Sequence, residues 1–411
     1  MFPRKNHAIF PFMKRGERQA SASVTRTSRG LVAAVLCLFL AACGGPSLSD
    51  LDRVLTRSWQ SYCRHFLSPE GRVVIPERGG DTISEAQAYA LLRAVWAGDA
   101  ATFARVYGWT RTHLSRQESH GDALLAWRWG KKADGAYGVL DANTASDGDL
   151  DYALALTLAA RRGWSPASGL PGYADEAYRV QQDILAKEVV TLPSGETLLA
   201  PGNWHESHPP YLLNPSYFFP AAYRLLRQSG GDHDWERLLE GVYTSLNRLA
   251  QGLPGRPGVG LFPDWVQVDA EGRFTPAPDR ENNFGWEAVR LPWRLALDRL
   301  WFGEERASRL LGQQFLPFLK MEWYTRGKIP AVYRLDGGPL VTYTSPVLYA
   351  GVLAAALAAG DQDFARRMAA KIRSSYYWET DDAAYFAAPD NYYANNWAWL
   401  GLALYQGWVK P

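Results

Sequence analysis

The alternation of short and long links between helical segments most constrains what this chain can fold into. Leu-, Ala- and Val-rich stretches with helical spacing recur from residue 48 onward, and alternating Val, Ile and Thr are scarce. The spacing predicts twelve helices, near residues 48–67, 84–97, 101–117, 147–162, 173–190, 215–229, 233–250, 284–301, 303–319, 345–359, 361–374 and 394–409.

The links after the odd-numbered helices are long and rich in Trp, Tyr, Gly and Pro, whereas those after the even-numbered helices are tight or moderate. Because successive helices run antiparallel, every long loop falls at one end of the molecule. Six such helical hairpins closed into a ring form an all-α (α/α)6 barrel, with a site among the long loops. An open solenoid of stacked helix pairs is the alternative, but no sequence repeat supports it.

Composition narrows the classes of function. Acidic and basic residues nearly balance over 411 residues, at a net charge of +2, so no basic surplus indicates a nucleic-acid partner. The 17 Trp and 21 Tyr are unusual. Most of them are expected to fill the core, but aromatic rings also stack on the flat C–H faces of sugars. No two His residues have the spacing of metal ligands on a helix, so neither a metal nor a cofactor is expected.

Residues 1–42 are predicted to be an export signal. Basic residues precede an apolar run from Leu31 to Ala42, which at about a dozen residues is too short to span a bilayer. The run leads into Leu-Ala-Ala-Cys43-Gly44, which resembles a bacterial lipobox and implies cleavage before Cys43 and lipidation of that residue. A plain secretory signal with an incidental cysteine is the alternative. Met13 is an alternative start.

The predicted mature chain, residues 43–411, is interpreted as one domain. Gly44 after the lipidated cysteine resembles lipoproteins sent to the outer membrane, so the protein is expected to face the periplasm and to touch membrane only through its lipid. Cys63 would be the remaining thiol, since Cys37 lies in the signal, and one thiol forms no intrachain disulfide. A monomer is expected.

Four junctions between a long loop and the next helix carry polar groups that the barrel would bring to one rim. These segments are Ser84-Glu85-Ala86-Gln87, Ala145 to Asp151, Asn214-Pro215-Ser216-Tyr217, and Trp286-Glu287-Ala288-Val289-Arg290. Taken singly, an acidic residue in a first helical turn caps the helix or complements its dipole. The Asp147/Asp149/Asp151 series is not a calcium loop, because Tyr152 and Leu158 stand where Gly and Glu are needed.

These junctions resemble glycoside hydrolase family 8, which includes periplasmic cellulases of bacterial cellulose-synthesis clusters. The resemblance runs from about Ser61 to Arg294 and rests on five short segments: Ser84 to Tyr89, Ala126-Trp127-Arg128-Trp129-Gly130, Ala145 to Asp149, Asn214 to Tyr217, and Pro263-Asp264-Trp265. It implies an inverting, endo-acting hydrolase of β-1,4-glucan.

The resemblance also implies roles for particular side chains. Glu85 matches the general acid, Asp147 the residue that holds the distorted sugar, and Tyr217 the residue that positions the attacking water. The general base of the family is an Asp in a Tyr-Asp-Ala-x-Arg segment, where this chain has Glu287. The extra methylene moves that carboxylate by about an ångström, and small misplacements of a catalytic group are costly.

Further substrate-binding candidates are aromatic or basic. The candidates for stacking on sugar rings are Trp127, Trp129, Trp204, Trp265 and Trp286. About half of them are expected to be structural instead, because Trp also packs helix ends. Arg128 and Arg290 are expected to orient carboxylates through bidentate pairs rather than to bind an anionic polymer.

Two other functions remain open. One is hydrolysis of another polysaccharide, such as chitosan, xylan or a biofilm glycan. The other is a catalytically weak lipoprotein that binds polysaccharide or assists an exopolysaccharide or cellulose secretion machinery. The change from Asp to Glu287 favours this last interpretation.

Overall fold

Helices make up most of residues 48–230, 234–380 and 383–411, which are the residues that the computed structural model describes. Six outer segments are α1 (Leu48–Phe66), α3 (Ala100–His113), α6 (Tyr173–Lys187), α8 (Asp234–Leu249), the continuous α10 (Glu305–Arg309), π-helical Leu310–Phe315 and α11 (Leu316–Arg326), and α13 (Gln362–Arg373). Six inner helices are α2 (Ser84–Ala97), α5 (Ser146–Arg161), α7 (Pro220–Gln228), α9 (Leu291–Phe302), α12 (Pro346–Ala358) and α14 (Tyr392–Gln406). A short α4 (Gln117–His120) lies in one loop.

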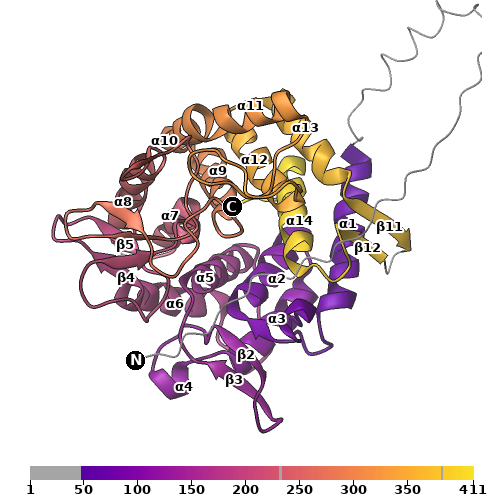
Figure 1. Ribbon diagram of the computed structural model, residues 1–411. Coiled ribbons are helices and arrows are strands. Elements are labelled where there is room, and N and C mark those ends of the chain that lie inside the picture. Colours follow the sequence, from indigo (N-terminus) through magenta and orange to yellow (C-terminus); the bar gives the residue numbers. More distant parts are fainter. Residues whose placement is uncertain (1–47, 231–233, 381–382) are drawn as a thin grey trace, which may run out of the picture. The chain divides into compact units, whose positions relative to one another are not determined.

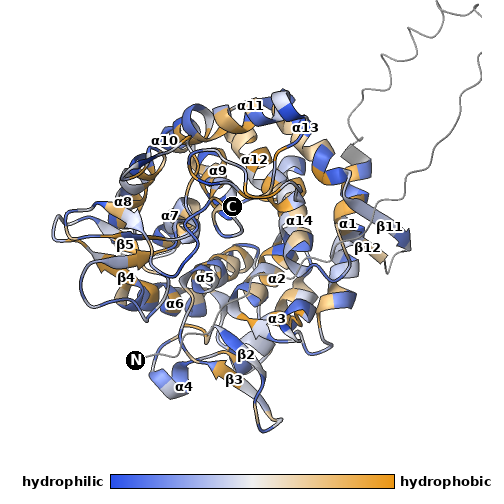
Figure 2. Cartoon of the chain, in the orientation of Figure 1, coloured by the Kyte–Doolittle hydropathy of each residue, from blue (hydrophilic) through white to orange (hydrophobic). Residues whose placement is uncertain are grey.

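The two sets form concentric rings (Figure 1). Each outer helix is followed along the chain by an inner one, which confirms the predicted (α/α)6 barrel of six hairpins. The inner helices are buried on nearly every side, and Figure 2 shows hydrophilic residues along outer helices such as α13. This division follows the rule that a helix apolar all round is buried, whereas an amphipathic one faces water.

The first and last inner helices close the ring. The rings of Tyr89 in α2 and Trp397 in α14 meet edge to face, with centroids 5.6 Å apart. Nη1 of the buried Arg93 donates to Oδ1 of Asn396 at 3.2 Å and to the Asn395 carbonyl oxygen at 3.4 Å. These contacts exclude the open solenoid, in which the ends of the array would not touch.

Small residues allow the inner helices to approach closely. A Cβ on Gly401 of α14 would lie 2.7 Å from Cβ and 3.0 Å from Cα of Ala350 in α12. We expect Gly401→Ala to lower the free energy of unfolding by about 1–3 kcal/mol, the usual cost of overpacking a core. The matched control is Gly108→Ala in α3, where the added Cβ meets only Leu170 Cδ1 at 3.6 Å. That change is expected to be neutral or stabilising by up to about 1 kcal/mol. Denaturant titration compares the two, and equal effects would contradict this account of the packing.

The long loops contain short strands that the sequence did not reveal. The strands are β1 (Thr82–Ile83), β2 (Arg128–Lys131), β3 (Tyr137–Asp141), β4 (Val189–Thr191), β5 (Thr197–Leu199), β6 (Tyr211–Leu213), β7 (Gly252–Leu253), β8 (Arg256–Pro257), β9 (Val266–Val268), β10 (Phe274–Pro276), β11 (Tyr376–Thr380) and β12 (Ala383–Phe386). They pair antiparallel in the orders β1-β2-β3 and β10-β9-β6, and as the hairpins β4-β5, β7-β8 and β11-β12. The two three-stranded sheets join loops distant in sequence, with Thr82 opposite Trp129 and Tyr211 opposite Val268.

Two predicted helix starts are wrong. The helix expected from residue 215 begins at Pro220, because Pro215–Tyr217 form a separate 3₁₀ turn and Phe218 is extended. The helix expected from residue 284 begins at Leu291, after a 3₁₀ turn over Ala288–Arg290. Glu287 therefore lies in the loop and turn before α9 rather than in the first turn of a helix.

The predicted signal and lipidation site, residues 1–42 and Cys43, lie outside the described residues. Among those that are described, none of the helices combines the length and apolar character needed to cross a bilayer.

Candidate active site

Arg290 is the centre of a cluster that joins three of the predicted site residues. Its Nη1 donates to Glu85 Oε2 at 2.5 Å and to Asp147 Oδ2 at 2.9 Å. Its Nη2 donates to Glu287 Oε2 and, at 2.9 Å, to Ser216 Oγ. Arg290 therefore contacts carboxylates, through one bond to each of three rather than through the bidentate pair that was expected.

The start of α2 and the start of α5 are fixed by hydrogen bonds to neighbouring loops. The N–H of Ser84 donates to the Trp127 carbonyl oxygen at 3.0 Å, and the N–H of Ser146 donates to that of Pro201 at 3.1 Å. The acidic residue following each of these serines is in the first turn of its helix. Two carboxylates far apart in the sequence are thereby brought to one guanidinium.

The cluster has a buried floor and a more accessible upper side. The side chains of Arg290 and Asp147 are 2% and 3% exposed, whereas those of Glu85 and Glu287 are 15% and 30% exposed. The two glutamates are therefore the carboxyl groups that a substrate could reach, while the arginine and the aspartate lie beneath them.

The carboxyl group of Glu85 has a raised pKa. Burial raises the pKa of its carboxyl group to about 8, opposed by the Arg290 charge and assisted by the charges of Asp147 and Glu287. One guanidinium cannot neutralise three carboxylates in a desolvated site, so one of them keeps its proton. Near neutral pH Glu85 is therefore a proton donor in contact with an arginine.

The shared arginine limits the separation of the two glutamates. Glu85 and Glu287 bind different terminal nitrogens of Arg290. Those nitrogens are about 2.3 Å apart and each hydrogen bond spans at most about 3 Å, so the two bound oxygens lie within about 8 Å of each other. Inverting glycosidases separate their acid and base by about 6.5–9.5 Å, so the limit is compatible with an inverting site despite the longer Glu287 side chain.

Asn214, which sequence reasoning did not single out, holds Glu287 from the side, and Ser216 holds Asn214 in turn. Asn214 Nδ2 donates to Glu287 Oε2 at 3.0 Å, while Asn214 Oδ1 accepts from the N–H of Ser216 at 3.0 Å and its hydroxyl at 2.7 Å. The Asn-Pro-Ser-Tyr segment was noted for its tyrosine alone. The available signal in the sequence was an Asn before a Pro, which is typical of a residue that caps a turn. That its amide nitrogen points to Glu287 is seen only in the structure.

Tyr217 lies beside the cluster, as predicted. The guanidinium carbon of Arg290 is 5.2 Å from the centre of its ring, and the ring meets Trp265 at 6.1 Å. Burial raises the pKa of Tyr217 well above its ordinary value, so the hydroxyl remains protonated and can donate a hydrogen bond. Trp265 is half-buried, which leaves part of its ring accessible next to the acid cluster.

Three other predicted tryptophans contact or adjoin the segments that carry Glu85, Asp147 and Glu287. The carbonyl oxygen of Trp127 accepts from the start of α2, and that of Trp286, the residue before Glu287, accepts from Tyr393 at 2.6 Å. Trp204 Nε1 donates to the Thr144 carbonyl oxygen at 3.1 Å, two residues before α5. Trp127 and Trp286 are half-buried and Trp204 is exposed, so all three keep accessible ring surface.

Trp129 does not fit the predicted role of a sugar platform. Its ring packs edge to face on Trp109 at 5.2 Å, stacks on Tyr137 at 5.3 Å and carries the Arg72 guanidinium at 4.4 Å. It is 9% exposed, so both faces are occupied and the residue is structural. Sequence alone could not separate it from Trp127, because residues two apart in an extended segment share a face. The rings and the guanidinium that cover Trp129 come from other segments of the chain.

Arg128 pairs with a carboxylate outside the cluster. Its Nε and Nη2 approach Asp81 Oδ2 at 2.8 and 2.6 Å. The arginine therefore binds a carboxylate as expected, but a structural one, and it braces the β1–β2 pairing.

Further buried carboxylates support the first turns of α5. Burial raises the pKa of Glu188 to about 8, and burial together with the nearby Glu188 charge raises that of Asp149 well above its ordinary value. Two neighbouring buried carboxyl groups favour the protonated form of at least one of them. Asp149 Oδ1 accepts from the N–H of Leu125 at 2.8 Å, and Glu188 accepts from the Thr144 hydroxyl. The pair thus ties α5 to the loops on either side.

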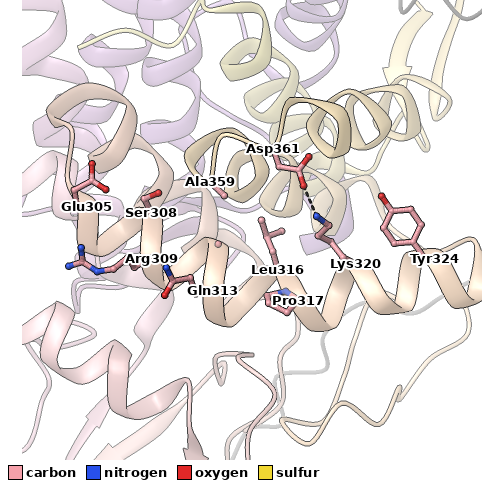
Figure 3. Close-up of a pocket in the computed structure, with 11 residues that line it drawn as sticks. Glu305, Ser308, Arg309, Gln313, Leu316, Pro317, Lys320, Tyr324, Ala359 and Asp361 are labelled. Atoms are coloured by element: carbon pink, nitrogen blue, oxygen red, sulfur yellow. Dashed lines mark hydrogen bonds and ion pairs between the residues drawn. The ribbon is translucent and has the colours of Figure 1, made fainter.

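A pocket of about 660 Å³ lies elsewhere, between the α10–α11 helix and the turn joining α12 to α13 (Figure 3). Lys320 Nζ and Asp361 Oδ2 pair on its wall at 2.6 Å. None of the predicted site residues lines it, so this pocket has no part in the chemistry of the acid cluster.

Comparisons with known proteins find similarity in sequence and in fold. An endoglucanase of Salmonella typhi is 30% identical over 262 residues, covering 62% of this chain and 65% of that protein. One from Escherichia coli (strain K12) is 32% identical over 237 residues, covering 57% and 60%. The matched region thus spans less than two thirds of either enzyme. The crystal structure of an endo-1,4-D-glucanase from Vibrio fischeri ES114 is 25% identical with a TM-score of 0.67, covering 85% of this chain and 94% of that one.

The family model described as glycosyl hydrolases family 8 matches residues 31–407, which contain all four rim segments and the whole described barrel except its last residues. With the ring of helices and the carboxylate cluster at its loop end, this match assigns the protein: the chain belongs to glycosyl hydrolase family 8.

Proposed function

We propose that this protein is an inverting, endo-acting glycoside hydrolase that cleaves β-1,4-glucan. The observation that carries the proposal is the pair of accessible carboxyl groups, Glu85 and Glu287, held at two ends of one guanidinium. Burial raises the pKa of Glu85 to about 8, so it holds a proton near neutral pH. Assigning acid and base to two carboxyl groups in different environments is the usual arrangement in glycosidases. Similarity to proteins named endoglucanases supports glucan as the substrate.

The reaction takes one step. The protonated Glu85 carboxyl donates its proton to the glycosidic oxygen while the bond from that oxygen to the anomeric carbon breaks. Glu287 removes a proton from a water molecule, whose oxygen bonds to the anomeric carbon from the opposite face. The leaving chain departs with a free hydroxyl, and the new reducing end has the inverted, α configuration. Exchange with solvent then restores both carboxyl groups.

The other cluster residues act on geometry and charge. Asp147, fixed by Arg290 at 2.9 Å, accepts hydrogen bonds from a sugar bent toward the oxocarbenium form. Tyr217, kept protonated by burial, orients the attacking water. The exposed ring surfaces of Trp127, Trp204, Trp265 and Trp286 stack on neighbouring sugars.

Export and a lipid anchor at Cys43 complete the proposal. The short apolar run and the Ala-Ala-Cys43-Gly44 sequence support cleavage at this cysteine and placement at the outer membrane, facing the periplasm. There the enzyme would trim an exopolysaccharide during its secretion, with the secretion machinery as a partner.

The proposal predicts both substrate and stereochemistry. Wild-type protein is expected to lower the viscosity of carboxymethylcellulose quickly relative to the release of reducing ends, as internal cleavage does. Proton NMR of cellohexaose digestion should show α-anomers before mutarotation, because water attacks the face opposite the leaving group. Chitosan and xylan serve as comparison substrates. Faster cleavage of either would replace glucan as the substrate, initial β-anomers would contradict inversion, and binding without cleavage would favour an accessory lipoprotein.

A further inference from the structure

The segment that carries Glu287 is not part of a helix, yet its main chain is held in place by a single carboxylate oxygen. Asp264 Oδ1 accepts from the N–H groups of Gly285 at 3.1 Å, Glu287 at 3.0 Å and Ala288 at 2.7 Å. The N–H of Asp264 in turn donates to the Asn283 carbonyl oxygen at 2.7 Å. Asp264 is 5% exposed, so these bonds are shielded from water.

Contacts outside Asp264 hold the edge of this segment and its carbonyl oxygens. The carbonyl oxygens of Gly285 and Glu287 accept from the N–H groups of Val289 and Arg290, each at 3.1 Å. Phe284 exchanges backbone hydrogen bonds with Tyr333 at 2.9 and 3.0 Å, and the Trp286 carbonyl oxygen accepts from the Tyr393 hydroxyl at 2.6 Å. The N–H groups on either side of the Glu287 side chain depend on Asp264. Buried N–H groups need a partner, so this one acceptor determines where the turn lies.

Gly285 makes room for the arrangement. A Cβ at this position would lie 2.5 Å from Asp264 Oδ2 and 3.4 Å from its Cγ. Glycine therefore lets the carboxyl group lie flat against the chain, where Oδ1 reaches three N–H groups at once.

The protonation state of Asp264 indicates what kind of hydrogen-bond acceptor is needed at this position. Burial raises the pKa of Asp264 to about 8, against the three backbone hydrogen bonds and together with the nearby Glu287 charge. Near neutral pH the carbonyl oxygen of a neutral acid then serves as the acceptor. An Asn side chain presents the same carbonyl oxygen without a charge.

We propose that Asp264 is a positioning residue that sets the location of the Glu287 carboxylate by fixing the main chain from residue 285 to residue 288. The inference rests on the proposed function in so far as Glu287 is the general base. Asp264 does not touch the substrate; it acts through the residue that does. It is also how a base one methylene longer than the usual Asp can be kept at a working distance from Glu85.

The first test separates the acceptor from the charge. Asp264→Ala is expected to lower kcat on cellohexaose about 100-fold with KM changed less than about threefold, because a base misplaced by about an ångström binds substrate but reacts poorly. Asp264→Asn should recover most of that kcat. The matched control is Asp269→Ala, which removes an acceptor of two backbone N–H groups in the β9–β10 turn and should leave kcat unchanged. Equal kcat losses in the Asn and Ala variants, or a loss carried by KM, would overturn the proposal.

The second test asks whether Asp264 acts through Glu287. In a Glu287→Gln background, adding Asp264→Ala should lower the residual rate by less than about threefold, since effects that pass through one residue are not additive. A further 100-fold loss in that background would show that Asp264 acts independently of the base.

The third test does not depend on activity. Crystal structures of wild type and Asp264→Ala should differ in the path of residues 285–288, with the Glu287 carboxylate moved away from Arg290. Gly285→Ala offers a second perturbation that keeps Asp264 itself, and a similar displacement is expected. An unchanged main chain in both variants refutes the inference, whereas a wild-type protein that cleaves no glycan refutes the proposed function alone.

Discussion

Replacement of Glu85 by Gln is expected to lower kcat on cellohexaose by about 100- to 10,000-fold, the range over which a positioned general acid contributes. Gln has the shape of the protonated acid and can still accept from Arg290 Nη1, but it has no proton to give to the glycosidic oxygen. Substrate binding should be retained. A cellooligosaccharyl fluoride, whose leaving group needs little protonation, should be cleaved with a much smaller loss.

The pH profile of the wild type supplies an independent check. The pKa of Glu85 is raised to about 8, and the acid acts only when protonated, so kcat should fall as the pH rises through about 8. The alkaline limb should disappear in Glu85→Gln. A profile with the same limb in both proteins would assign the proton donor to another group.

The raised pKa also affects stability. Because Glu85 has a higher pKa in the folded than in the unfolded state, its contribution is fully present below pH about 4.5 and is lost as the pH rises through about 8. Glu85→Gln removes the charge and should therefore be at least as stable as the wild type above pH 8. A large loss of stability there would mean that inactivity reflects unfolding.

Removal of Arg290 is expected to have the largest effect on stability. Arg290→Ala leaves Glu85, Asp147 and Glu287 facing one another without their cation, and losing one partner of a buried ion pair costs about 3–5 kcal/mol. Activity should fall at least about 100-fold, because Glu287 then retains a proton and cannot act as a base. Arg290→Lys keeps one charge but not the fork that reaches two glutamates, so it should be more stable than the Ala variant and still poorly active.

The stability loss in Arg290→Ala should depend on pH. The Arg290 charge lowers the pKa of Glu85, so its removal raises that pKa further above the unfolded value and the folded state binds more protons. Its stability is then greater at low pH and falls as the pH rises. The difference from wild type, measured by urea titration, is expected to widen from pH 5 to pH 8.

Arg224→Ala is the matched control for this variant. Arg224 also binds two carboxylates, Asp298 at 2.7 Å and Glu304 at 2.5 Å, but at the end of α9 away from Arg290. Its removal should lower stability and leave kcat unchanged. If Arg290→Ala lost no more stability than this control, the three-carboxylate account of the cluster would be wrong.

The barrel could be predicted because its determinants are repeated along the chain. Apolar spacing predicts each helix separately, and the alternation of link lengths predicts which ends share a face. The errors occur where local contacts override spacing: Pro215 and Pro220 divide one predicted helix, and the N–H bonds to Asp264 hold residues 285–288 out of another. Strands of two to five residues were missed because they are too short for an alternating pattern.

The candidate site was predicted less evenly. Placing Glu85, Asp147 and Glu287 at one rim required only topology and short motifs. That one arginine contacts all three could not be predicted, since Arg290 and Glu85 are 205 positions apart and the contact depends on side-chain directions. For the same reason Asn214 was overlooked, and Trp129 was taken for a sugar platform although its neighbours cover both faces.

The contacts that close the inner ring also determine the stage of synthesis at which the barrel can be completed. Arg93 binds Asn395 and Asn396, partners 302 and 303 positions away along the chain. Loop-closure entropy opposes such distant pairing, and chains rich in distant pairs fold slowly. Glu85 therefore emerges early in synthesis, but it acquires its complete surroundings only after the final helix has been made and has docked. Until then the aromatic and polar side chains of α2 that face α14 remain without their partners.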